Sequence, residues 1–244
     1  MEVYKEIFNA SSLYDMLFIN VTGVLEYPTL NEMATNNVKM ANSWFNLTNG
    51  DNSNALYQEK AIEYPEFTKI VAISYGNFYF DNGLQRNFKR IVNENEFLLL
   101  GTIMSDLNQL STGSKVMLCG ENIISNDIPL LIKRFLIHKA NFDGEDQKLP
   151  SLLKNYLIAK PWDSSILDTR MVWKFNGLSA SPANSQELYS NFLGLKKTVE
   201  LLSNSDLSKY YWESNDADKM NFIGLQSATK VNLAMQLMNF LREL

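Results

Sequence analysis

Met16-Leu17-Phe18-Ile19-Asn20-Val21-Thr22-Gly23 is a short apolar run near the start of the chain. A second run, Lys69-Ile70-Val71-Ala72-Ile73-Ser74-Tyr75, is rich in β-branched residues, which favours a buried strand over a helix. We predict that both runs form central strands of a sheet. The first run contains the polar residues Asn20 and Thr22, and their spacing of two places both side chains on one face of the strand.

Further strands and helices follow in an order that indicates a layered α/β protein. Asp81-Asn82-Gly83 lies between two short apolar segments, and Asn-Gly supplies the positive φ angles that a tight hairpin turn requires. Apolar residues then recur at helical spacing over 95–110 and 128–138. Pro129 lies in the first turn of the second helix, where proline costs least. Residues 115–119, between these helices, are predicted to form a strand.

The second half of the chain is predicted to be mainly helical. The helical segments expected there are 149–157, 185–193, 195–202 and a long last helix over about 216–244. Asparagine favours turns and caps; it makes up 28 of the 244 residues and is concentrated in 31–54. We therefore predict a single domain, residues 1–244, with an Asn-rich loop inserted at about 28–55.

Charge and composition argue against several classes of function. The net charge of −5 and the pI of about 5.1 give the surface no overall attraction for a phosphate backbone, so nucleic-acid binding would need a local basic patch. One Cys and one His cannot form a conventional zinc site or an internal disulfide. The chain shows no secretion signal, and no apolar run approaches the roughly 18 to 20 residues that span a bilayer. We expect no membrane partner and a location in the cytoplasm or within a virus particle.

Several separated segments, taken in order, resemble one known family. They are Leu56-Tyr57-Gln58-Glu59-Lys60-Ala61 with the following Tyr64-Pro65-Glu66-Phe67-Thr68, then Cys119-Gly120-Glu121-Asn122-Ile123-Ile124-Ser125-Asn126-Asp127-Ile128-Pro129, then Lys160-Pro161-Trp162 and Leu167-Asp168-Thr169-Arg170-Met171-Val172-Trp173. Together they are similar to the predicted 3′→5′ exonucleases related to the proofreading domain of family-B DNA polymerases. The resemblance covers nearly the whole chain. It implies the ribonuclease-H-like exonuclease fold, a mixed central sheet flanked by helices.

The resemblance also implies where a catalytic site would lie. Such nucleases use two divalent ions about 3.5 to 4 Å apart to activate a water and to stabilise the leaving oxygen. Four acidic residues hold the ions: two on the first strand as Asp-x-Glu, a third in the second motif, and a fourth on the last helix in a Tyr-x-x-x-Asp pattern. Hard cations of this kind require such carboxylates, because the negative charge offsets the hydration that the ion loses.

Three of these four acids are absent from the chain. Asn20 and Thr22 stand in place of Asp-x-Glu, and Leu225 and Thr229 stand in place of the tyrosine and aspartate of the last motif. Asp127 is the acid that remains. The degenerate positions therefore lie near both ends of the chain, and a single error of alignment does not explain them.

We therefore predict that no functional catalytic or metal site remains. Residues 219–242 contain no Asp or Glu, so shifting the alignment of the last helix does not restore the fourth acid. One carboxylate cannot neutralise two ions with a total charge of about +4. No cofactor is expected; Mg²⁺ or Mn²⁺ would be needed only if other residues replace the lost acids. Asp127 is then expected to cap the helix that follows it, and Asn20 and Thr22 are expected to be buried and hydrogen-bonded.

A few side chains could contact nucleic acid. Asn122 belongs to the second motif, and Lys133 and Arg134 lie on the helix that follows. Solvated helix faces explain such lysines and arginines equally well, so these three residues are weak candidates.

Three functions remain open. The first is a pseudo-exonuclease, an inactive protein in which the fold is reused as a structural or protein-interaction component of a larger assembly, such as a bacteriophage particle. Its partners would be other protein subunits, including further copies of the same chain. The second is an active metal-dependent 3′→5′ exonuclease acting on DNA. The third is a non-catalytic nucleic-acid-binding protein.

Overall fold

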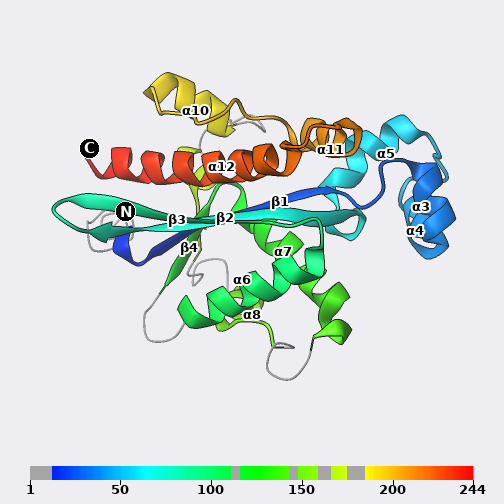
Figure 1. The fold of residues 1–244 in the computed structure, drawn as a ribbon, viewed down its shortest axis with the longest axis horizontal. Helices are drawn as coiled ribbons and strands as arrows, with labels where there is room; N and C mark the ends of the chain where they lie inside the picture. Colours follow the sequence, from blue (N-terminus) through cyan, green and yellow to red (C-terminus); the bar gives the residue numbers. More distant parts are fainter. Residues whose placement is uncertain (1–12, 111–115, 143–147, 159–165, 175–184, 244) are drawn as a thin grey trace.

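A five-stranded sheet with the order β3 (Leu84–Val92), β2 (Thr68–Phe80), β1 (Met16–Leu25), β4 (Met117–Gly120) and β5 (Ile166–Asp168) runs through the centre of the protein (Figure 1). The computed structural model describes residues 13–110, 116–142, 148–158, 166–174 and 185–243. β1, β2 and β3 are antiparallel neighbours, whereas β4 and β5 run parallel to β1. The predicted α/β class and mixed sheet are confirmed.

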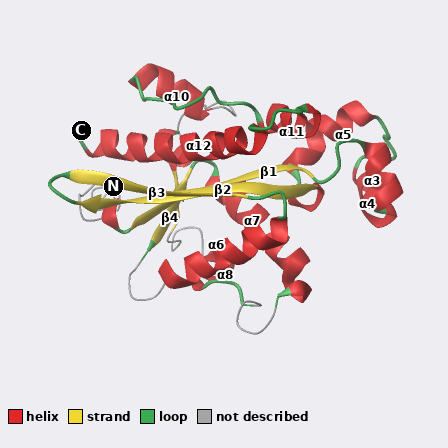
Figure 2. Cartoon of the chain, viewed as in Figure 1, coloured by secondary structure: helices red, strands yellow, loops and turns green. Residues whose placement is uncertain are grey.

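Helices cover both faces of this sheet (Figure 2). One face carries α10 (Ser185–Leu193), α11 (Asn204–Glu213) and α12 (Lys219–Arg242), and the other carries α6 (Glu96–Leu110), α7 (Ile128–His138) and α8 (Ser151–Ile158). Beyond the end of β1 lie α3 (Leu30–Asn36), α4 (Val38–Leu47) and α5 (Asn54–Lys60). The short helix α9 (Thr169–Trp173) follows β5, and single helical turns occupy Ala61–Glu63, Pro65–Phe67 and Lys139–Asn141.

The alternation of side chains along β1 divides the core into two layers. Leu17, Ile19 and Val21 pack with α6 and α7 on one face of the sheet. Met16 and Phe18 pack with α12 on the other face. Because side chains of a strand alternate between faces, the two polar residues that follow Phe18 at a spacing of two also lie on the α12 face. The last helix of the chain therefore covers the polar part of β1.

The Asn-rich segment is not the loop that was expected. It forms α3 and α4. Apolar side chains of both helices pack into one cluster, in which Met33 of α3 and Trp44 of α4 are fully buried. Asn37 ends α3 and caps α4, because its side chain accepts a hydrogen bond from the Met40 backbone N–H, 3.1 Å away. Asparagine here marks the boundary between two helices, and the loop prediction failed because caps and loops share the same composition.

A second expectation, a helix over 195–202, is also wrong. This segment is not helical; its backbone is held by glutamine side chains of α12. Gln226 Oε1 accepts a hydrogen bond from the Leu202 N–H, and Gln236 Oε1 accepts one from the Lys196 N–H. The next helix, α11, begins only after Ser203, whose hydroxyl accepts the hydrogen bond that caps it. Tertiary contacts with α12 thus replace the local hydrogen bonds of a helix.

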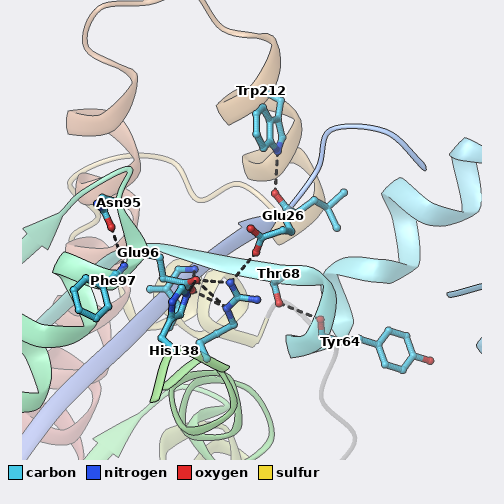
Figure 3. A network of polar contacts seen from close by, with 11 residues as sticks. Glu26, Tyr64, Thr68, Asn95, Glu96, Phe97, His138 and Trp212 are labelled. Atoms are coloured by element: carbon cyan, nitrogen blue, oxygen red, sulfur yellow. Dashed lines mark hydrogen bonds and ion pairs between the residues drawn. The ribbon is translucent and has the colours of Figure 1, made fainter. Parts of the chain in front are cut away.

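A buried ion network ties α6 and α7 to the sheet (Figure 3). Glu96 of α6 accepts hydrogen bonds from the Ile70 N–H of β2 at 2.6 Å and from Arg134 Nε at 2.9 Å. His138 Nε2 lies 2.8 Å from the same carboxylate. Arg134 also bonds Glu26, at the end of β1, at 2.7 Å. Since Arg134 and Glu96 are both buried, each charge depends on the other for compensation.

Two neighbouring substitutions test this network. Arg134→Ala leaves Glu96 buried without its cation, and we expect it to lower the free energy of unfolding by about 3 to 5 kcal/mol. Lys133→Ala removes an adjacent cation whose side chain is exposed and paired with the exposed Glu66, so its cost should stay below about 1 kcal/mol. Urea denaturation of both variants measures the difference. Similar small losses in the two variants would contradict the role given to Arg134.

Candidate functional site

The edge of β1 that faces β4 is paired along only a short length. β4 pairs with Met16, Leu17 and Phe18 and then ends at Gly120. A Cβ built at Gly120 would lie 2.5 Å from the Ile19 carbonyl oxygen, so only glycine permits this close approach. Beyond this point the backbone of β1 needs hydrogen-bond partners from outside the sheet.

Asp127 supplies one of these partners. After β4 the chain passes through Asn122, which has a φ of 55°, and a π-helical turn, η3 (Ile123–Asp127), that leads into α7. Asp127 Oδ2 accepts hydrogen bonds from the Val21 backbone N–H at 3.0 Å and from Asn20 Nδ2 at 3.1 Å. Asp127 Oδ1 accepts one from Asn126 Nδ2 at 2.7 Å. The carboxylate is 1% exposed, so these protein donors replace its hydration.

The expectation that Asp127 caps α7 is therefore wrong. Its side chain makes no capping hydrogen bond and instead faces β1. Asp168, at the end of β5, is the acid that accepts backbone N–H groups here, and it does so at η3, the turn that precedes α7. Its carboxylate accepts hydrogen bonds from the backbone N–H groups of Asn122 and Ile124 and so holds the start of η3. The two acids thus fix the two ends of the same turn.

Asn20 and Thr22 complete a short chain of hydrogen bonds. Thr22 Oγ1 donates to Asn20 Oδ1 at 3.1 Å, while Asn20 Nδ2 donates to Asp127. Both side chains are buried. From α12, Ser227 Oγ donates to the Asn20 backbone oxygen at 3.3 Å. The first strand, the second motif and the last helix therefore meet at Asn20, and their contacts there are hydrogen bonds.

The last-motif positions assigned from the sequence do not belong to this meeting point. An α-helix turns by about 100° per residue, so Thr229 lies about 200° around α12 from Ser227, and Leu225 lies equally far in the other direction. Since Ser227 faces β1, Leu225 and Thr229 face away from it. Thr229 is fully buried, and its hydroxyl has no hydrogen-bond partner within the part of the chain that the structure describes.

A cation, rather than an acid, acts on Asp127 from α12. Burial raises the pKa of Asp127 to about 6, against hydrogen bonds and the charge of Lys230, which lower it. Lys230 is half-buried, and burial lowers the pKa of its ammonium group, whereas Asp127 and then Glu121 raise it. Lys230 Nζ also donates to Asn204 Oδ1 at 3.3 Å.

This set of donors and acceptors does not fit a two-metal centre. The oxygens of Asp127 accept N–H groups, and the Asn20 and Thr22 oxygens are engaged with each other. The charge supplied by Lys230 is positive, so it would repel a divalent ion. Within the described residues, no three His, Cys, Asp or Glu side chains are grouped so that they could hold a metal.

The sequence analysis did not single out Glu121, a half-buried carboxylate that directly follows β4. It accepts hydrogen bonds from Thr169 Oγ1 at 2.6 Å, from Ser185 Oγ, and from the Tyr189 hydroxyl at 3.5 Å. Burial raises its pKa, and the bonds from Ser185 and Thr169 oppose that rise. Glu121 thereby attaches α9 and α10 to the end of β4. Its partners lie 48 to 68 residues away, so no local pattern could have revealed them.

The three candidates for nucleic-acid contact are not brought together as a basic patch. Arg134, one of the weak candidates, is buried in its ion pairs with Glu26 and Glu96. Lys133 is exposed but lies 2.5 Å from Glu66. Asn122 Oδ1 accepts a hydrogen bond from Arg170 at 3.2 Å. The family-like segment Lys160-Pro161-Trp162 lies outside the described residues.

Comparison with known proteins does not assign the chain to a family. No family model matches it, and no curated protein matches it. Among the described helices, none is long and apolar enough to cross a membrane.

The raised pKa of Asp127 predicts a specific dependence of stability on pH. Between pH about 4 and 6 the folded protein holds a proton that the unfolded chain releases, so the contribution of Asp127 to stability falls as the pH rises. Asp127→Asn cannot ionise. Relative to this variant, the wild type should lose on the order of 2 kcal/mol between pH 4 and pH 7.

Urea denaturation of the two proteins across this range measures the effect, and other titrating groups cancel in the difference. A difference that is independent of pH, or that changes in favour of the wild type as the pH rises, would contradict the burial of an ionisable Asp127.

Proposed function

We propose that the chain has a ribonuclease-H-like exonuclease fold whose metal site is replaced by hydrogen bonds, and that it acts as a non-catalytic structural or protein-interaction component of a larger assembly. One observation carries this proposal. Asn20, Thr22 and Asp127 meet where a nuclease of this type would hold its ions, and there they hydrogen-bond to one another.

The fold proposal is supported by the way in which the three motif-bearing elements come together. β1 lies in the middle of the sheet, and α12 crosses the face on which its polar residues lie. The segment after β4 returns to β1 through Asp127. This is the arrangement that the resemblance implies for the first strand, the second motif and the last helix. The agreement concerns elements far apart in the sequence, which gives it weight.

The proposal that the protein is non-catalytic rests on charge. A pair of divalent ions needs several carboxylates around it, because carboxylates supply both oxygen ligands and negative charge. Here Asp127 is buried and fully hydrogen-bonded, and Lys230 already supplies a positive charge beside it. Binding an ion would require breaking hydrogen bonds that satisfy the backbone of β1. The site therefore favours a folded state that needs no metal.

The role in protein interaction follows from what is retained. The residues around the former site are buried and paired, so they stabilise the sheet and its helices without taking part in chemistry. A framework maintained in this way can present its outer surface to other proteins. We expect its function to lie on that surface rather than in a cleft at Asp127.

A nuclease assay tests the catalytic part of the proposal. Purified protein is incubated with end-labelled single-stranded DNA and either Mg²⁺ or Mn²⁺, beside the Asp127→Asn variant as a matched control. We expect no nucleotide release that depends on Asp127, since the ligands for two ions are absent. Asparagine keeps the shape of the side chain, so the control should fold. Release by the wild type that the variant loses would overturn the proposal and favour the active exonuclease.

A further inference from the structure

Strand β3 forms an open edge of the sheet. Among the described residues it pairs only with β2, and six consecutive residues of this nine-residue strand are exposed. In an antiparallel edge strand, alternate residues direct their backbone N–H and C=O groups outward, away from the neighbouring strand. β3 therefore offers unpaired hydrogen-bonding groups along its length, at the same spacing as any strand that could be added to it.

This edge is basic although the chain is acidic. Residues 82–93 contain no Asp or Glu but include Arg86, Lys89 and Arg90. Phe88 is paired with Gly76, which is in turn paired with Phe18 of the α12 core. Alternation along the strand therefore places Arg86, Phe88 and Arg90 on the α12 face.

The two arginines keep their positive charge unneutralised. Arg86 Nη1 donates to Asn232 Oδ1 at 2.7 Å, and Arg90 Nη2 donates to Asn221 Oδ1 at 3.1 Å. Both acceptors are neutral amides of α12, and within the described part of the chain neither guanidinium forms an ion pair. Lys89 differs, because it faces the opposite side of the strand. There its ammonium group lies 2.7 Å from Asp106.

Phe88 lies between these two arginines in sequence and on the same face. Its side chain is 41% exposed, which is high for a phenylalanine. Together with Arg86, it lines a hollow of about 370 Å³ whose other walls are Gln85, Thr198, Ala228 and Asn232. An apolar side chain of a bound partner could enter this hollow and cover the exposed ring of Phe88. Acidic side chains beside it on the partner could then reach the guanidinium groups of Arg86 and Arg90.

We infer that the β3 edge accepts an extended segment of a partner protein as an additional strand, with acidic residues at positions i and i+4 and an apolar residue at i+2. This inference rests on the proposed function, because it names the surface and the kind of partner. In cross-strand pairing the three residues lie opposite Arg86, Phe88 and Arg90, since both strands have the same rise per residue. Backbone hydrogen bonds supply affinity, and the acidic spacing supplies specificity.

The same geometry disfavours two other occupants. Antiparallel pairing of β3 with β3 of a second copy, centred on Phe88, would place Arg86 of each copy opposite Arg90 of the other, and like charges in that position destabilise a pair. Nucleic acid would neutralise the arginines but would leave the backbone groups of the edge without strand partners. The net charge of −5 also opposes the approach of a polyanion.

A synthetic peptide tests the inference. The probe is a fluorescently labelled peptide of nine residues with glutamate at its third and seventh positions, valine at its fifth and threonine elsewhere. A control peptide of the same composition carries its glutamates at the third and sixth positions, so they cannot share a face of a strand. We expect the full chain to bind the first peptide more tightly than the control, as measured by fluorescence anisotropy.

Two single substitutions in the protein provide a matched control. Arg86→Gln and Lys89→Gln each remove one positive charge from the same exposed strand. We expect Arg86→Gln to weaken binding of the first peptide by about fivefold and Lys89→Gln by less than about twofold. Circular dichroism checks that both variants fold. In addition, bound peptide should slow amide hydrogen exchange in β3, which attraction between charges alone would not do.

Several outcomes would overturn the inference. They are no binding of the first peptide, equal binding of the two peptides, equal weakening by the two substitutions, or unchanged hydrogen exchange in β3. Tighter binding of labelled single-stranded DNA that Arg86→Gln weakens would assign the edge to nucleic acid instead. None of these results depends on DNA cleavage, so the inference can fail while the absence of nuclease activity still stands.

Discussion

The rest of the site depends on one constraint: the buried backbone N–H of Val21 needs an acceptor, and Asp127 supplies it. β4 ends after pairing with only the first part of β1, and a buried N–H group without an acceptor is costly. The turn after β4 brings a carboxylate to that place. The same carboxylate orients the Asn20 side-chain amide, and Asn20 Oδ1 in turn accepts a hydrogen bond from the Thr22 hydroxyl. Strand β1, the η3 turn and the start of α7 are thereby fixed relative to one another.

On the proposed function, this arrangement explains how β1, η3 and α12 stay ordered without bound ions. A cluster of several carboxylates repels itself unless cations are present, and so such a site depends on bound metal. Here one carboxylate is present, the backbone amide of Val21 and the side-chain amides of Asn20 and Asn126 satisfy it, and Lys230 contributes a favourable charge. The cost is the burial of an ionisable group, which is seen in the raised pKa of Asp127. Stability and catalysis are thus separated: the contacts that hold the elements together occupy the oxygens that ions would need.

The sequence predicted the α/β class, the hairpin and the long last helix, because each has a local pattern. It also singled out Asp127, but gave it the wrong role, since its partners Asn20 and Val21 lie more than 100 residues away. Leu225 and Thr229, which the resemblance assigned to the last motif, lie on the side of α12 away from Ser227 and β1. The sheet covers one side of α12, and α10 and α11 cover another. Its buried residues, such as Ser227 and Thr229, therefore lie on more than one side of the helix. Hydrophobic periodicity could not identify the face that meets β1.

The most direct test of the central claim is to observe the Val21 amide by NMR while Mn²⁺ is added to the ¹⁵N-labelled protein. A paramagnetic ion held by Asp127 would broaden this resonance strongly, because the N–H donates to the carboxylate that would bind the ion. Our account predicts that stoichiometric Mn²⁺ leaves the Val21 resonance unchanged, since protein donors occupy both oxygens of Asp127. Selective broadening of Val21 and Asn20 at stoichiometric Mn²⁺ would contradict it.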